Sequence, residues 1–78
     1  MSNIKRVLSS LLTLGITSEE KAIDVEELAN KIGLNVSELN EPLSELLRLG
    51  HLRRIFFKGK EYFYLTATGI IAACSIYS

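Results

Sequence analysis

The sequence contains few of the residues that form disulfides, metal sites or kinks. It has one cysteine, Cys74, one histidine, His51, one proline, Pro42, and no tryptophan. A single cysteine cannot close a disulfide within the chain, which favours a reducing, cytoplasmic location. Apolar neighbours predict that Cys74 is a buried thiol without a catalytic role. His51 has no second ligand at a metal-binding spacing, so no metal site is expected.

Long apolar runs and catalytic motifs are also missing. No run approaches the roughly 18 apolar residues that span a bilayer. The N-terminal segment has two basic residues before its apolar positions, but no small-residue cleavage site follows, so a mature helix is expected there. No glycine-rich phosphate loop occurs, and no serine has a histidine base at a useful spacing. These absences predict a protein that is not an enzyme and uses no cofactor.

Charge is distributed unevenly along a chain whose net charge is zero. Residues 1–18 carry +2, residues 19–45 carry −6 and residues 46–78 carry +4. Apart from Arg48, the bases of the last segment lie in residues 53–60, and no charged residue follows Glu61. Because hydrophobic residues make up 47% of the 78 residues, we expect one folded domain.

Residues 24–50 predict two short amphipathic helices joined by a tight turn. Asp24 and Asn35 are suited to cap the two helices, with Glu27 and Glu38 three residues later. A turn is expected at residues 33–35, since Gly33 follows the last periodic apolar residue of the first helix. Such a pair forms a helix-turn-helix.

Pro42 is out of place in the second helix. A proline inside a helix removes a backbone hydrogen bond and crowds the preceding turn. We therefore expect an irregular turn at residues 36–40 and regular helix over residues 41–49, which would place Pro42 in the first helical turn.

The segments on either side complete the expected architecture. Residues 3–14 have a helical apolar period, and residues 51–66 alternate as two strands. A type II′ turn at Gly59-Lys60 would pair the strands. The pairs expected are Lys58 with Glu61, Phe57 with Tyr62, Phe56 with Phe63, and Ile55 with Tyr64. Leu52, Phe56, Phe63 and Leu65 would share the core face. Residues 67–77 predict a closing helix that is apolar nearly all round.

Three segments resemble the winged helix-turn-helix fold: ELANKIGLN from Glu27, LLRLGHLRR from Leu46 and YFYLTATG from Tyr62. The last is similar to the Tyr-x-Leu-Thr-x-x-Gly pattern of MarR-, PadR- and ArsR-like regulators and of small winged-helix proteins of archaea and their viruses. The resemblance implies an α+β fold in a single domain, 1–78, with three helices, a C-terminal β-hairpin wing and a closing helix. Its parts would be the helix-turn-helix at 24–50, the wing at 51–66 and the closing helix at 67–77.

The same resemblance implies a homodimer that binds double-stranded DNA, with the second helix of the motif in the major groove and the wing on the backbone or minor groove. Polar and basic side chains on these elements are the candidate DNA contacts. They are Ser37, Asn40, Ser44, Arg48, Arg53, Arg54, Lys58 and Lys60. Apolar side chains of the closing helix are the candidate dimer interface. They are Ile70, Ile71, Cys74, Ile76 and Tyr77.

The second helix departs from the pattern of a DNA reader, because residues 36–49 sum to −2. Its exposed face is expected to include Glu38, Glu41 and Glu45, which phosphates would repel. The sequence therefore leaves two functions open. One is a small transcriptional regulator that binds DNA, and the other is a winged-helix module that binds a protein partner in a larger assembly.

Overall fold

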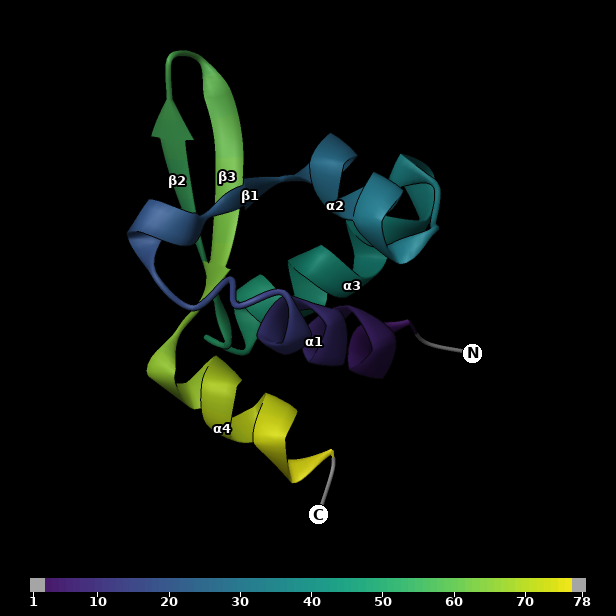
Figure 1. Ribbon diagram of the computed structural model, residues 1–78, viewed down its shortest axis with the longest axis vertical. Coiled ribbons are helices and arrows are strands. Elements are labelled where there is room, and N and C mark those ends of the chain that lie inside the picture. Colours follow the sequence, from purple (N-terminus) through teal and green to yellow (C-terminus); the bar gives the residue numbers. More distant parts are fainter. Residues whose placement is uncertain (1–2, 77–78) are drawn as a thin grey trace.

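The computed structural model describes residues 3–76, which form four α-helices, one short 3-10 helix and a three-stranded antiparallel sheet (Figure 1). The order along the chain is α1 (Ile4–Thr13), η1 (Glu19–Lys21), β1 (Ile23–Asp24), α2 (Val25–Ile32), α3 (Val36–Arg48), β2 (Leu52–Phe57), β3 (Lys60–Leu65) and α4 (Ala67–Ser75). The strand order in the sheet is β1-β3-β2. This is the winged helix-turn-helix fold, with β2 and β3 as the wing.

The two helices of the motif are capped at the residues that the sequence indicates. The Asp24 carboxylate accepts a hydrogen bond from the N–H of Glu27 at 2.9 Å, which caps α2. Gly33 ends α2 with a φ of +72°, a conformation that glycine adopts without steric cost. At the start of α3, the Glu38 carboxylate accepts the N–H of Asn35 at 3.0 Å. The predicted turn at residues 33–35 is confirmed.

The predicted irregular turn at residues 36–40 is wrong, because α3 is helical from Val36 to Arg48. The contact between Glu38 and the N–H of Asn35 fixes the helix start six residues before Pro42. Pro42 itself is buried, beside the buried Leu39 and Leu43. Its missing N–H costs one helical hydrogen bond, and burial of this apolar stripe offsets that cost.

The wing closes one residue earlier than predicted. Phe57 pairs with Lys60, Phe56 with Glu61 and Ile55 with Tyr62, so the two turn residues are Lys58 and Gly59. Both have positive φ, +51° and +75°, which is the signature of a type I′ turn. The type II′ turn at Gly59-Lys60 is therefore wrong. A type I′ turn matches the right-handed twist of the strands and needs glycine at its second position.

The change in pairing moves each partner by two residues and leaves every side chain on its expected face. Leu52, Phe63 and Leu65 are buried in the core as predicted. Phe56 lies on the same face by alternation, but it is opposite Glu61 near the tip and is 68% exposed. Its predicted core position is therefore wrong.

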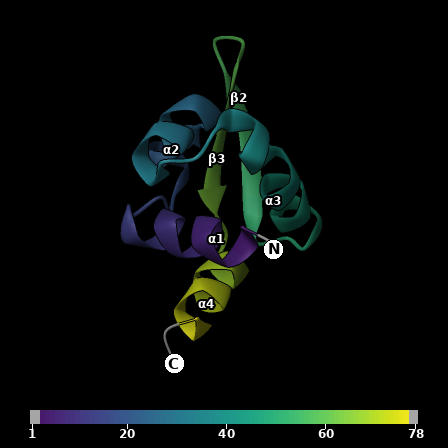
Figure 2. The same ribbon diagram turned by 90° about the vertical axis from the view of Figure 1, so that its right-hand side faces the viewer.

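The core lies between the helices and the inner face of the sheet. Figure 2 shows α1 between α4 and the pair α2 and α3, so α1 carries apolar contacts on two sides. Each α-helix and each strand contributes buried residues, and η1 contributes none. The fully buried large side chains are Val7, Leu11, Leu28, Leu39, Leu46 and Leu65.

The closing helix begins at a hydrogen-bonded junction. The Thr66 hydroxyl accepts the N–H of Gly69 at 3.1 Å and caps α4. The N–H of Thr66 donates to the His51 carbonyl at 3.0 Å. These bonds fix α4 to the start of β2, at the base of the wing.

Candidate nucleic-acid interface

The wing and α4 lie at opposite ends of the molecule, whose longest dimension is 38 Å (Figure 1). The hairpin β2–β3 extends beyond the helices, and α3 leads directly into β2 through a short turn at Leu49–His51. The candidate DNA contacts are thus on adjacent elements: four lie on α3, and four lie on the wing.

All four candidate side chains of α3, namely Ser37, Asn40, Ser44 and Arg48, are exposed. Arg48 forms a bidentate contact with the Glu45 carboxylate, at 2.8 Å from Nε and 2.6 Å from Nη2. The hydrogen bond from Arg48 lowers the pKa of Glu45 below its ordinary value, and the same bond raises the pKa of Arg48. The sequence reasoning counted these two charges separately, but the structure pairs them.

The acidic residues of α3 differ in what they do. Glu38 holds the helix start through Asn35, and Glu45 holds Arg48. Glu41 is exposed, and within residues 3–76 it has neither an ion pair nor a side-chain hydrogen bond. Glu41 is therefore the acidic group on this face most open to repulsion by a phosphate.

All four basic residues of the wing are exposed, and two of them form ion pairs with described residues. Arg54 lies 3.2 Å from the Glu61 carboxylate, and Lys60 lies 3.5 Å from the Asp24 carboxylate. Within residues 3–76, no carboxylate pairs with Arg53 or Lys58. Arg53 and Lys58 are thus the bases of the wing that can bind an anion without breaking an ion pair.

The sequence reasoning missed the exposed aromatic residues of the wing as candidate contacts. The Arg54 guanidinium lies 5.6 Å from the ring centre of Phe56, and the Lys58 ammonium lies 5.4 Å from that of Phe57. The two rings are on opposite faces of the hairpin, since neighbouring residues of a strand alternate. The signal available in the sequence was a basic residue within two positions of each phenylalanine near the turn.

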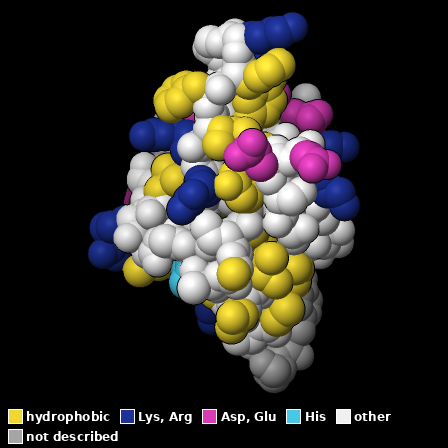
Figure 3. All heavy atoms as spheres, turned by 90° about the vertical axis from the view of Figure 1, so that its left-hand side faces the viewer, with side chains coloured by type: hydrophobic (Ala, Val, Ile, Leu, Met, Phe, Trp, Pro, Cys, Tyr) yellow, Lys and Arg dark blue, Asp and Glu magenta, His cyan; other side chains and the backbone are white. Residues whose placement is uncertain are grey.

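The structure separates the candidate dimer residues into two groups. Ile70 and Ile76 are half-buried against the core. Ile71 is 70% exposed, and Cys74, three residues later, is exposed as well. Figure 3 shows hydrophobic side chains gathered on this end of the molecule, over α4. Tyr77 lies outside the described residues.

The predicted burial of Cys74 is therefore wrong for the single chain. Gly69 and Ala73 are the residues of α4 that face the body and are buried. Small residues on that face allow α4 to pack closely on α1, while Ile70 and Ile76 are half-buried and Ile71 points away. The apolar neighbours of Cys74 predicted its burial, but Cys74 lies with the exposed Ile71 on the outer side of α4, whereas Ala73 faces the body.

Within residues 3–76, no helix is long and apolar enough to cross a membrane. Among the same residues, no three or more His, Cys, Asp or Glu side chains come together in a way that could hold a metal ion.

Comparisons with known proteins support the fold. The chain is similar to a candidate DNA-binding protein from Ralstonia eutropha JMP134, with a TM-score of 0.79, 24% identity and coverage of 96% of this chain and 94% of that one. It is also similar to SSV1 F-93, with a TM-score of 0.75, 19% identity and coverage of 97% and 82%. The third similar structure is the DNA-binding TubR fragment from Clostridium botulinum, with a TM-score of 0.71 and 24% identity. The match covers 88% of this chain and 91% of that one.

These likenesses show the winged helix-turn-helix fold. No family model matches the sequence, and no curated protein matches it either.

Proposed function

We propose that this chain is a single winged-helix domain that binds double-stranded DNA as a homodimer and acts as a small, non-enzymatic transcriptional regulator in the cytoplasm. Two of the structurally similar proteins are described as DNA-binding, one of them as a candidate. The observation that carries the proposal is the pair Arg53 and Lys58. Both are exposed on a wing that extends beyond the body, and neither has a carboxylate partner within residues 3–76.

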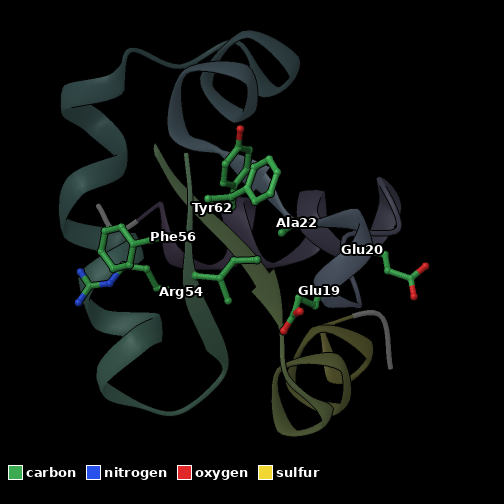
Figure 4. A pocket seen from close by; sticks show the side chains of 8 residues that line it. Glu19, Glu20, Ala22, Arg54, Phe56 and Tyr62 are labelled. Carbon is green, nitrogen blue, oxygen red and sulfur yellow. The ribbon is translucent and has the colours of Figure 1, made fainter. Parts of the chain in front are cut away.

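The wing supplies most of the affinity in this proposal. Phosphate contacts by lysine and arginine give binding that depends on salt but not on sequence. Arg54 and Phe56 are on the face of the hairpin that continues the core face, and their side chains lie together in Figure 4. There the guanidinium can reach a phosphate once it leaves Glu61, while the ring packs on the neighbouring sugar.

The helix α3 supplies sequence recognition through short polar side chains. Asn40 and Ser44 lie one helical turn apart on its exposed side, and asparagine can bind adenine through two hydrogen bonds. Arg48 becomes a phosphate or guanine contact only when it leaves Glu45. The acidic residues thus weaken non-specific binding by α3 and leave affinity to the wing.

The exposed side of α4 supplies the dimer contact. Ile71 and Cys74 are apolar, adjacent and at the end of the molecule opposite the wing (Figure 1). A two-fold axis beside α4 would bury the same residues from both chains and leave both wings pointing outward. Paired wings and α3 helices can then contact two half-sites.

The test is a titration of the protein onto fluorescent duplex DNA at about 50 mM and about 200 mM salt, a range over which several phosphate contacts cost a large factor in affinity. We expect micromolar or tighter binding at low salt and a steep fall at high salt. Absence of binding at low salt would refute the proposal.

The second candidate function is a module that binds a protein partner. It is favoured by the −2 charge of residues 36–49 and by Phe56 and Phe57, which are 68% and 58% exposed. Exposed aromatic residues are typical of protein interfaces. The salt titration separates the two functions, since this module would leave duplex DNA unbound.

A further inference from the structure

A groove of about 770 Å³ lies on the outer face of the wing, between the hairpin and the segment that contains η1 and β1. Ile55, Phe57 and Tyr62 of the hairpin line one side, and Glu19, Glu20 and Ala22 line the other. Arg54 and Phe56 also border it, but their side chains lie across β2 from Tyr62 and Ala22 (Figure 4). The volume is within the range of pockets for drug-sized ligands, roughly 300–1,000 Å³.

The floor of the groove is apolar and aromatic. Ile55 and Tyr62 are directly opposite in the sheet and half-buried, so they form a firm base. The Phe57 ring stands beside them at the tip and is 58% exposed. Because Lys58 holds its ammonium 5.4 Å from the centre of this ring, the structure already shows the ring accepting a cation.

The rim of the groove is acidic. Neither Glu19 nor Glu20 forms an ion pair or a side-chain hydrogen bond within residues 3–76. In Figure 4 the Glu19 side chain lies at the groove, and that of Glu20 lies further out along the same rim. An aromatic floor with an unpaired carboxylate at its edge is complementary to a molecule that is both aromatic and positively charged.

We propose that this groove is a binding site for a small aromatic cation. The aromatic part of the ligand packs on Ile55, Phe57 and Tyr62, and its positive charge lies near Glu19. The groove shares the tip of the wing with the proposed DNA interface, since Lys58 lies over Phe57 and Arg53 is on the same face of the hairpin, but its ligand contacts are Phe57, Tyr62 and Glu19. The inference therefore does not depend on DNA binding.

The probe is tetraphenylphosphonium, and the control is tetraphenylborate, an anion of the same shape. Calorimetric titration of the unmodified protein, without DNA, measures both. We expect saturable binding of the cation with a dissociation constant below about 1 mM, and binding of the anion at least about tenfold weaker. In a parallel amide NMR titration, the signals of Ala22, Ile55 and Phe57 should move, while those of α4 should not.

Variants locate the contacts. Glu19→Gln should weaken cation binding about fivefold, in line with the modest strength of exposed charge pairs. Lys58→Ala should strengthen it, because it removes a competing ammonium from Phe57. The matched control is Glu26→Gln, an exposed carboxylate of α2 outside the groove, which should leave the affinity unchanged.

Three results would overturn the site. One is the absence of saturable binding of the cation. Another is equal binding of the cation and the anion, which would show hydrophobic adsorption without charge selection. The third is movement of the α4 signals around Ile71 in place of those of the groove. The NMR result uses the unmodified chain, so it decides the location even where a variant fails to fold.

Discussion

The Cα of Gly69 lies so close to the backbone of His51 that no side chain fits between them. A Cβ on Gly69 would be 2.8 Å from the His51 carbonyl carbon and closer still to its oxygen. The hydroxyls of Thr66 and Thr68 both donate to the carbonyl of Gly50, at 2.6 and 2.9 Å. The Thr-x-Thr-Gly segment is therefore a junction that fixes α4 to the base of the wing.

Replacing Gly69 by alanine should destabilise the protein. The added methyl meets a backbone carbonyl that is itself held by the N–H of Thr66, so α4 must shift away. We expect a loss of about 2–3 kcal/mol in the free energy of unfolding, measured by urea denaturation.

The control is Ala67→Gly, which exchanges the same residue types in reverse at an exposed position of α4. It should cost less than about 1 kcal/mol, the difference in helix propensity. If Gly69→Ala instead stabilises the protein, as propensity alone predicts, the close contact does not exist in solution.

Lys58→Asn should stabilise the wing. Lys58 has a φ of +51°, which costs energy for a lysine, whereas Asn-Gly is a preferred type I′ pair. We expect a gain of about 0.5–1 kcal/mol by thermal unfolding. Lys60→Asn, which removes the same charge from a strand position, should bring no gain. An equal gain from both changes would attribute the effect to charge and not to the turn.

Glu45→Gln should raise the affinity for DNA by freeing Arg48. The carboxylate now holds the guanidinium in two hydrogen bonds, and the amide would hold it more weakly. We expect a gain of about threefold to tenfold in binding measured by fluorescence anisotropy at low salt. Glu26→Gln on α2, with the same change in charge, should give a smaller gain.

The pKa of Glu45 reports the same contact. It should lie below its ordinary value in the folded protein and return toward that value in Arg48→Met. Because the pKa of Glu45 is lower in the folded protein than in the unfolded chain, the contact stabilises the fold fully at a pH above the ordinary pKa. This stabilisation is lost as the pH falls through the lowered pKa of the folded protein. Carboxyl NMR titration of both proteins checks the shift, and an unchanged pKa in Arg48→Met would contradict it.

Replacing Arg53 and Lys58 together by alanine should weaken DNA binding and flatten its dependence on salt. Each lost phosphate contact lowers the slope of log affinity against log salt by about 0.9, so the slope should fall by about 1.8. With Arg54 and Lys60 also replaced, it should fall by up to about 3.6. Lys5→Ala with Lys21→Ala removes two exposed charges elsewhere and is the control. Equal effects of the two double variants would mean that net charge, not the wing, determines binding.

Ile71→Glu should convert a dimer into a folded monomer. The side chain is 70% exposed in the single chain, so the charge does not disturb the core, but it would be buried in the proposed interface. Sedimentation should show a dimer for the unmodified protein and a monomer for the variant. Val36→Glu, at the exposed start of α3, should remain a dimer. An unmodified protein that is monomeric at high micromolar concentration would contradict the interface.

The order of elements was determined by the sequence itself. The cap at Asp24, the turn at Gly33 and the strand alternation of residues 51–66 are local signals, and the structure confirms the helices and strands that they predicted. The faces of the two strands were predictable too. A change of pairing by two residues leaves the alternation intact, so Leu52 stays in the core although its hairpin closes elsewhere.

Exposure, ion pairs and close backbone contacts depend on which elements meet in space, and only the tertiary structure decided them. Phe56 and Cys74 have apolar neighbours in the sequence, yet both are exposed, because exposure depends on where a strand or helix leaves the body. The sequence could not pair Arg54 with Glu61 or separate Ile71 from Ile70. Gly69 stands in the sequence only as the end of the segment YFYLTATG, since the His51 carbonyl that excludes a side chain there comes from 18 residues earlier.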